Sequence, residues 1–353
     1  MTTLGQFDLP PMPPLDAERL ERHGTADRRL AARIAAVDES TRRAFVYVQH
    51  RILVEAAASI EPSRPGHEPE VLPIRRRYIG PSQSERRDGV ARALRHVDER
   101  VTMARRGLTG GVLLPETPMV LHAFVEGSDP QGRHTNAGMV RVTPNSFAEG
   151  DIPFTPPPPE HCRRLLEEAI QLTIQAPAPT LTRAMWLLAT VFAVHPFVDG
   201  NGRTGRLLMH AVLAADSATG TDWGTIPEFA AFRRQYLEAT RVPLRPSLPS
   251  YDARKMEPIH LMRWTADAAT RGIERVLDRL DHIDGLTQRA VANYGPIAGL
   301  VVVAVIADRN ARLAELTQLV PDPDLTHAVN ELVASGVLHW DRWGGLQSDV
   351  EMR

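Results

Sequence analysis

The chain of 353 residues is long enough for two or three domains, and its 43% hydrophobic and 24% charged residues are typical of a globular protein. Its net charge of −2 gives no support to general binding of nucleic acids or of anionic membranes. The single cysteine, Cys162, excludes an internal disulfide and a metal site built from cysteines.

Nothing in the sequence predicts export or insertion into a membrane. Residues 1–15 carry Asp8 and several prolines and lack the basic-then-apolar pattern of a signal peptide. No apolar run reaches the roughly 18 residues that a membrane helix requires. We therefore expect a cytoplasmic protein with no membrane partner.

The N-terminal region, residues 1–110, is expected to be helical after an extended, Pro-rich arm. Residues 16–60 mix apolar and polar side chains at helical spacing, and the pattern stops at Pro62. Residues 63–73 are rich in proline, glycine and charge, which predicts a loop. Residues 84–106 predict a second helix with valines and leucine on one face.

A central region, residues 111–283, begins with a change of character. An apolar run at 119–125 is followed by a turn-rich segment at 127–132 and by a second short segment at 138–142. This order predicts either a two-stranded hairpin or a helix, a loop and a strand.

Helices dominate the rest of the central region. Residues 159–174 predict one helix, and Thr180 or Thr182 is the expected N-cap of the helix that follows. A polar loop then leads into a helix over 202–215. Further helices are expected over the ranges 227–242 and 254–283.

Residues 286–353 predict a third unit, a winged helix-turn-helix. Its expected parts are three short helices at 298–306, 313–319 and 325–335, and a two-stranded wing over 336–346. This unit has eight acidic residues and five arginines, so its net charge is 5 − 8 = −3, and its third helix has no Lys or Arg. Because a DNA-recognition helix normally contributes cations, we favour protein interaction or dimerisation over DNA binding.

The loop and helix start at 195–206 carry the chemistry. Glycines at 200, 202 and 205 allow backbone N–H groups to approach an anion closely, and a helix beginning near Gly202 directs its positive end at that anion. Arg203 and Arg206 lie three residues apart and share roughly one helix face, with guanidinium forks that suit phosphate oxygens.

Asp199 would repel a bare phosphate, and a bound Mg²⁺ resolves this conflict because magnesium takes a carboxylate together with phosphate oxygens. His195 ionises near neutral pH and suits a general base that accepts the proton of an attacking hydroxyl. Each of these residues alone is more often structural, but their combination predicts a Mg-nucleotide site and transfer of a phosphorus-bearing group. The stretch is neither a Walker A loop nor a Rossmann fingerprint.

Residues 195–206 resemble the Fic family signature, His-Pro-Phe-x-Asp/Glu-Gly-Asn-Gly-Arg-x-x-Arg, at every defined position. The segment from Gly138 to Arg141 resembles the family's Gly-x-x-Arg flap, and residues 154–157 resemble the Phe-x-Pro-Pro that follows it. The resemblance covers residues 40–280 and implies a mainly α fold: a Fic-type helical core with a β-hairpin flap, here followed by the winged helix.

The resemblance implies AMPylation, in which Mg-ATP donates AMP to a Ser, Thr or Tyr hydroxyl of a protein. It makes His195 the general base, Asp199 the Mg²⁺ ligand and Phe197 the anchor of the loop. The remaining implied nucleotide contacts are Gly200, Asn201, Gly202, Arg203, Gly205, Arg206 and, with a weaker match, Tyr236. The implied docking flap for the target's main chain consists of Gly138, Met139, Val140 and Arg141.

Class II members of the family carry an inhibitory helix, Ser/Thr-x-x-x-Glu-Gly/Asn, before the core. The candidate here ends in Glu61, but Ala57 replaces the Ser/Thr and Pro62 replaces the Gly/Asn. Glu61 would compete with a phosphate for the guanidinium of Arg206. The alternative is that Glu61 is a solvated residue at a helix end.

Two other functions stay open. One is a Fic variant that removes AMP or transfers another phosphoryl group. The other is a transcriptional regulator whose core senses a ligand and whose winged helix reads DNA. The sequence leaves the protein target unnamed and allows a homodimer.

Overall fold

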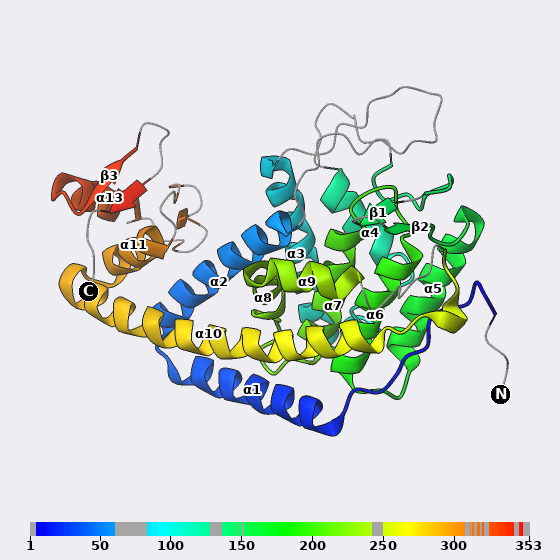
Figure 1. Ribbon diagram of the computed structural model, residues 1–353. Coiled ribbons are helices and arrows are strands. Elements are labelled where there is room, and N and C mark those ends of the chain that lie inside the picture. Colours follow the sequence, from blue (N-terminus) through cyan, green and yellow to red (C-terminus); the bar gives the residue numbers. More distant parts are fainter. Residues whose placement is uncertain are drawn as a thin grey trace. The chain divides into compact units, whose positions relative to one another are not determined.

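The computed structural model describes residues 5–60, 83–127, 136–145, 147–149, 152–241, 250–307, 325–341 and 346–348, with a few single positions between 311 and 320. These residues form a mainly α-helical protein with two small antiparallel hairpins (Figure 1). The mainly α fold with a β-hairpin beside a helical core is thereby confirmed. No described helix has both the length and the apolar content needed to cross a membrane.

The chain forms two compact units, and neither is continuous in sequence. The first contains Met1–Asp27 and Val54–Gly272, and the second contains Arg28–Leu53 and Ile273–Arg353. The three sequential domains expected above (1–110, 111–283 and 286–353) stay a prediction. The long helix α10, Ile259–Tyr294, runs without interruption through residues 283–286.

The helices and strands that lie wholly or partly in the first unit are α1 (Ala17–Ala36), α2 (Glu39–Ser59), α3 (Gln83–Arg105), α4 (Thr117–Glu126), β1 (Phe147–Glu149), β2 (Ile152–Phe154), α5 (Pro159–Gln175), α6 (Thr180–Val194), α7 (Asn201–Asp216), α8 (Thr225–Ala231), α9 (Arg233–Arg241), a 3₁₀ turn at Ala253–Lys255, and the first part of α10.

The core of the first unit is the pair α6 and α7, which Figure 1 shows in green among the surrounding helices. Both helices are buried on nearly every side. Helix α6 is apolar or small almost all round, whereas α7 also buries Asn201, Arg203, Arg206 and His210. Gly205 lets them approach closely, since a Cβ there would lie 3.3 Å from Leu188 and from Val191. Such contact leaves no room for a larger residue without repacking.

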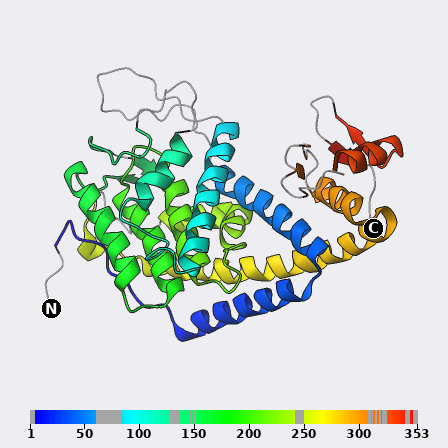
Figure 2. The same cartoon turned by 180° about the vertical axis from the view of Figure 1, so that it is seen from behind.

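The neighbouring helices bury one face each against this pair. On α5 the buried residues are Cys162, Leu165, Leu166, Ala169, Ile170 and Thr173. This is the spacing of an amphipathic helix, and α5 packs on α6. Helix α3, shown in cyan, packs against both α4 and α7 (Figure 2).

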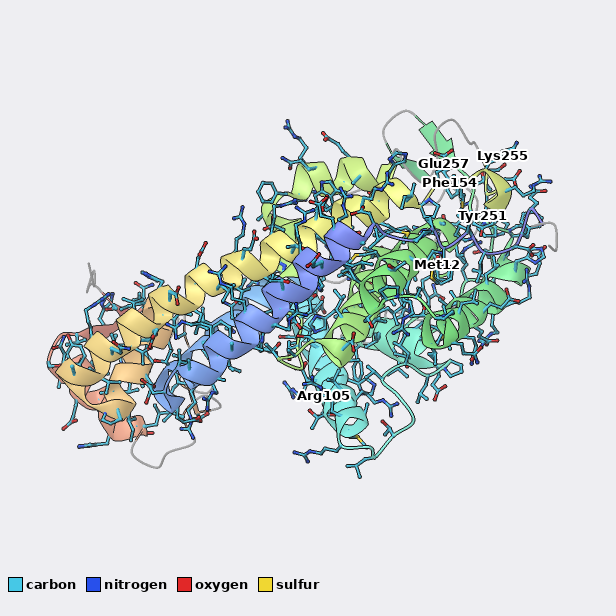
Figure 3. The ribbon with its side chains drawn as sticks, turned by 90° about the horizontal axis from the view of Figure 1, so that it is seen from below. Met12, Arg105, Phe154, Tyr251, Lys255 and Glu257 are labelled. Atoms are coloured by element: carbon cyan, nitrogen blue, oxygen red, sulfur yellow. The ribbon has the colours of Figure 1, made fainter. Side chains whose placement is uncertain are left out.

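The segment after residue 118 forms a helix, not the first strand of a hairpin. Residues 119–125 belong to α4, and residues 138–142 are irregular. The hairpin lies later, where Phe147 pairs with Phe154 and Glu149 with Ile152. It is joined to a distant segment by the N–H of Tyr251, which donates to the carbonyl of Thr155 at 2.8 Å, and Figure 3 labels Phe154 and Tyr251 at this end of the unit.

Two local expectations are wrong for physical reasons. Pro179, with an extended backbone, occupies the N-cap of α6, and no described side chain caps the helix there, so neither Thr180 nor Thr182 does. The helix expected over 227–242 is two helices, α8 and α9, which break at Phe232. Helices α3, α5 and α7 lie within one residue of their expected bounds, whereas α10 begins at Ile259 and ends at Tyr294, eleven residues beyond the end expected at 283.

The second unit holds α11 (Pro296–Ala307), α13 (Leu325–Ala334) and a hairpin of β3 (Leu338–Trp340) and β4 (Leu346–Ser348). Leu338 pairs with Ser348 and Trp340 with Leu346. These are the first and third helices and the wing expected from the sequence. The second helix, over 313–319, lies only partly in the described residues.

Candidate active site

The loop between α6 and α7 turns sharply at both of its ends. His195 ends α6 with φ 48° and ψ 59°. Among the described residues, it is the one non-glycine residue with a left-handed backbone. Gly200 begins α7 with φ 74° and ψ 3°. A left-handed backbone is costly for a residue with a Cβ, so His195 must be held in place by its surroundings.

Arg141 supplies much of that restraint. Its Nε donates to the carbonyl of His195 at 2.8 Å, and its own N–H donates to the carbonyl of Pro196 at 2.9 Å. Its guanidinium also donates to Thr143 and Pro157 carbonyls, and the side chain is buried. The structure therefore places Arg141 beneath the loop that carries His195, where its side chain fixes the loop. The docking role expected of the flap's main chain stays a prediction.

Asn201 and Phe197 close the loop on itself. The N–H of Phe197 donates to Asn201 Oδ1 at 2.9 Å, and Asn201 Nδ2 donates to the carbonyl of Phe197 at 2.8 Å. Phe197 is fully buried, as expected for an anchor. The amide of Asn201 is thus bonded at both ends to the loop backbone and closes the loop on itself. The phosphate contact expected of Asn201 stays a prediction.

Two polar residues of the loop are partly exposed to solvent. His195 and Asp199 are both partly exposed, whereas Phe197, Gly200 and Asn201 are buried. Asp199 Oδ1 accepts from the N–H of Gly200 at 2.7 Å, yet its side chain remains 41% exposed. A carboxylate presented in this way beside a helix N-terminus fits one ligand of a Mg²⁺ whose other ligands are phosphate oxygens and water. Among the described residues, no group of three or more His, Cys, Asp or Glu is arranged for a metal, so Asp199 would share the ion with the nucleotide.

The N-terminus of α7 offers the anion site. Its N-cap is Gly200, and no described side chain caps its first turn, which includes Gly202. The first N–H groups of a helix have no partner within the helix, and they carry the positive end of its dipole. The N-terminus of α7 therefore lies beside Asp199 without a side-chain cap, and its contact with a phosphate stays a prediction.

Arg203 points into the protein. Its Nη2 lies 2.7 Å from Glu126 Oε1 and 3.5 Å from Asp199 Oδ2, and both Arg203 and Glu126 are buried. A buried pair of this kind holds both helices in register, because losing one partner would leave an uncompensated charge. The phosphate contact expected of Arg203 stays a prediction.

Arg206 lies at the end of α2. It is fully buried, its Nη2 donates to the carbonyl of Ala57 at 3.5 Å, and its guanidinium lies 6.0 Å from the centre of the Tyr236 ring. Arg233 Nε donates to the carbonyl of Ile60 at 2.6 Å. The buried Arg206 and the partly exposed Arg233 thus meet the C-terminal carbonyls of α2, where cations are favourable. Glu61 lies outside the described residues.

Tyr236 belongs to an aromatic cluster next to Arg206. Its ring stacks on Phe229 at 4.5 Å between centroids and lies 5.8 Å from Trp264. It is fully buried. The structure therefore brings Tyr236 and Arg206 together, and the nucleotide contact expected of Tyr236 stays a prediction.

The flap segment has one buried and one exposed side. Gly138 has φ 75°, and a Cβ there would lie 3.2 Å from both the carbonyl of Met119 and the side chain of Ala123. Val140 is buried, whereas Met139 is 54% exposed and Val142 is 82% exposed. Exposed apolar side chains of this kind can contact an added peptide strand.

Two polar residues of α4 belong to this site and were missed from the sequence. His122 and Glu126 are four residues apart, so they share one face of the helix, and both are buried. His122 stacks on Phe197 with ring centroids 3.9 Å apart and an angle of 5° between the planes. Burial lowers the pKa of His122 to about 4, so the ring is neutral at neutral pH. A His and a Glu at helical spacing in an otherwise apolar run were the available signal.

Residues 119–213 match the family model described as the Fic/DOC family. The matched range covers most of α4, the flap, the hairpin, α5, α6, the loop and most of α7. A 30-residue stretch is 57% identical to a Fido domain-containing protein of Dictyostelium discoideum. That stretch is 8% of this chain and only 21% of the Dictyostelium protein.

Two solved structures share the fold at low sequence identity. A Fic family protein from Desulfovibrio desulfuricans G20 is 12% identical, with a TM-score of 0.51 over 97% of this chain and 99% of that one. A Fic domain-containing signaling protein from Bacteroides thetaiotaomicron VPI-5482 is 14% identical, with a TM-score of 0.52 over 75% of this chain and 98% of that one.

Proposed function

Because residues 119–213 form a domain of the Fic/DOC family, we propose that the chain is a protein adenylyltransferase. It transfers AMP from Mg-ATP to the hydroxyl of a Ser, Thr or Tyr in a protein. The observation that carries the proposal is the presentation of His195 and Asp199. These are the two titratable residues of a loop in which Pro196, Phe197 and Gly200 are buried, and both are partly exposed at the N-terminus of α7.

His195 acts as the general base. Arg141 holds the carbonyls of His195 and Pro196, which fixes the backbone of the loop before substrate arrives. The acceptor hydroxyl loses its proton to the imidazole as its oxygen forms a bond to the α-phosphorus, and the bond to pyrophosphate breaks. Because the backbone of His195 is already fixed, little entropy is lost in orienting the imidazole when the substrate binds.

Asp199 and the start of α7 hold the donor. Asp199 provides a carboxylate ligand for Mg²⁺, and the N–H groups near Gly202 face the phosphate oxygens. When bound, Mg²⁺ neutralises charge on the phosphates and supports the departure of pyrophosphate. Arg206 lies one turn farther along α7, where its guanidinium reaches the outermost phosphate once it leaves the carbonyl of Ala57.

We further propose that α2 restrains the enzyme. The carbonyls at its C-terminal end already receive Arg206 and Arg233, and Glu61 follows directly after Ile60. A Glu61 carboxylate paired with Arg206 would exclude the outer phosphate from the same guanidinium. Removal of the carboxylate in Glu61→Gly is then expected to increase transfer.

The test is incubation of the full chain with Mg²⁺ and α-labelled ATP, with mass analysis of the modified residue. Wild type and Glu61→Gly should acquire AMP, with more on Glu61→Gly. His195→Ala should acquire none. If no variant transfers AMP to itself or to added protein, the adenylyltransferase proposal is wrong, and release of AMP from a pre-modified protein would support the AMP-removing variant instead.

A regulator that binds DNA is the second candidate, because α11, α13 and the β3–β4 wing match parts of a winged helix. Its charge opposes this function. Residues 286–353 carry a net charge of 5 − 8 = −3, and α13 has no Lys or Arg. We therefore assign this region to binding of a protein or of a second copy. A gel shift of the full chain on duplex DNA that weakens with salt would favour the regulator.

A further inference from the structure

His122 joins two functional segments that are far apart in sequence. Its Nδ1 lies 2.9 Å from the N–H nitrogen of Gly138 in the flap, 16 residues away. Its Nε2 lies 3.0 Å from the carbonyl oxygen of Asp199 in the catalytic loop, 77 residues away. The side chain belongs to α4 and is only 1% exposed, so water cannot readily replace either partner.

The partners fix the tautomer of the ring. A backbone N–H can only donate, so His122 Nδ1 must accept from Gly138. A neutral imidazole then carries its proton on Nε2, which donates to the Asp199 carbonyl. One ring therefore uses both nitrogens, each in a different role, to connect the flap to the loop.

The surrounding contacts hold the ring in this orientation. Phe197 lies parallel to it at 3.9 Å, and Phe197 is itself bonded to Asn201 at the start of α7. Gly138 approaches α4 so closely that a Cβ would lie 3.2 Å from the Met119 carbonyl. The flap N–H can reach His122 because residue 138 has no side chain and a left-handed backbone.

We propose that His122 is a positioning residue that couples the flap to the metal-binding part of the catalytic loop. This inference rests on the proposed function for the roles of the two segments. The ring holds the flap at a fixed position relative to Asp199, so a displacement of one segment also displaces the other. A merely structural histidine would add stability without linking the two.

Three substitutions separate the two hydrogen bonds. In His122→Asn, the side-chain oxygen can take the place of Nδ1 and keep Gly138, while the bond to Asp199 is lost. In His122→Gln, the longer amide can place an N–H near the position of Nε2 and keep Asp199, while the bond to Gly138 is lost. His122→Phe keeps the stack on Phe197 and loses both. His96→Asn is the matched control. His96 lies on α3 and packs on Phe124 of α4, the helix that carries His122, with ring centroids 5.6 Å apart.

The experiment measures amide hydrogen exchange at Gly138 and the dissociation constant of Mg-ATP by calorimetry in the full chain. The Gly138 amide should exchange about tenfold faster in His122→Gln and His122→Phe and near the wild-type rate in His122→Asn. Mg-ATP should bind roughly 3- to 10-fold more weakly to His122→Asn and His122→Phe and with near wild-type affinity to His122→Gln. Mg-ATP should slow exchange at Gly138 in wild type and in His96→Asn, and not in the three His122 variants.

Equal losses of melting temperature in all three His122 variants, with unchanged Gly138 exchange and unchanged Mg-ATP affinity, would overturn the inference. So would a nucleotide effect on Gly138 that persists in His122→Phe. If wild type fails to bind Mg-ATP, the proposed function fails instead. The link between the two segments is then decided by exchange at residues 197–200, which should rise in His122→Asn and stay unchanged in His122→Gln.

Discussion

At the scale of single residues, the site depends on a few positions where the backbone allows no alternative. Gly200 has φ 74°, and a Cβ there would lie 2.6 Å from Glu126 Oε1, the oxygen that pairs with Arg203. A side chain at this position would strain the backbone and also push Glu126 from its partner. Gly107 has a similar φ of 70° with nothing near its missing Cβ.

We therefore expect Gly200→Ala to cost more stability than Gly107→Ala. The left-handed backbone alone costs about 1–2 kcal/mol, and displacement of a buried ion-pair partner adds about 1–3 kcal/mol. Thermal melting of the two variants measures the difference. Equal melting temperatures would show that Glu126 adjusts freely, and the account of its pairing with Arg203 would then be wrong.

A second expectation at this scale concerns pH. Burial lowers the pKa of His122 to about 4, while the unfolded chain takes up its proton near pH 6.5. Between these values the unfolded state binds the proton and the folded state does not. The free energy of unfolding should therefore fall as pH drops from 6.5 to 4, by at most about 1.4 kcal/mol per pH unit from this group.

Urea unfolding of wild type and His122→Asn at pH 4.5, 5.5 and 6.5 isolates this contribution. Other titrating groups, including His23 whose pKa is also lowered by burial, act in both proteins and cancel in the comparison. The free energy of unfolding should change less steeply with pH in His122→Asn than in wild type, with a difference in slope that corresponds to at most one proton. Identical slopes would contradict the buried, neutral state of His122.

The sequence located the site but assigned several side chains too simply. His195, Asp199 and the glycines of the loop could be identified because their spacing along the chain specifies the chemistry. The side chains of Asn201 and Arg141 also bond to the loop backbone, a role that the sequence did not indicate. Such bonds depend on which carbonyls a fold brings near, and the spacing of residues does not contain that information.

At the scale of elements, the junction of α2 with the core is the point of control. Arg233 donates to the Ile60 carbonyl at 2.6 Å, directly before Glu61. Its neighbour Arg234 is 83% exposed and lies 3.8 Å from Glu238. Substituting Arg233, with Arg234 as the control, therefore loosens the end of α2 without changing a residue expected to contact the nucleotide.

We expect Arg233→Ala to raise AMP transfer and Arg234→Ala to leave it unchanged. Without the bond to Ile60, the end of α2 should fray and Glu61 should hold Arg206 less well. Hydrogen exchange over residues 54–60 should increase in Arg233→Ala alone. Increased exchange without increased transfer would mean that α2 is structural and does not restrain the enzyme.

The helices and the C-terminal wing followed from the sequence pattern, whereas the position of the first hairpin and the end of α10 did not. The helices around α5, α6 and α7 were predicted because their apolar faces repeat at helical spacing. For residues 119–125 the sequence left a strand and a helix open, because the run is equally apolar as either, and it did not predict the hairpin at 147–154. Only packing against α3 and α7 decides between the two.

At the scale of the whole molecule, the two compact units interleave along the chain. In the second unit Arg33 pairs with Asp281 at 2.7 Å and with Asp284 at 2.8 Å, and Arg279 donates to Gln49 at 2.8 Å. Residues 28–53 therefore depend on partners more than 200 residues away. No local pattern in the sequence could reveal that dependence.

This interleaving predicts how truncations behave. A chain ending at Tyr294 keeps the partners of Arg33 and Gln49, and we expect it to stay folded and to transfer AMP. A chain ending at Gly272 loses those partners and the buried apolar residues of α10 after 272, so its melting temperature should fall or it should aggregate. Equal stability of the two truncated chains would contradict the division into these units.

The central claim is that His195 moves the proton while the start of α7 holds the nucleotide. It is tested most directly by intact-mass measurement after incubation of the Glu61→Gly chain with Mg-ATP, with and without His195→Ala. The account predicts one or more added AMP groups on Glu61→Gly and none on Glu61→Gly/His195→Ala, although both bind Mg-ATP with similar affinity. Equal AMP addition to both proteins would contradict it.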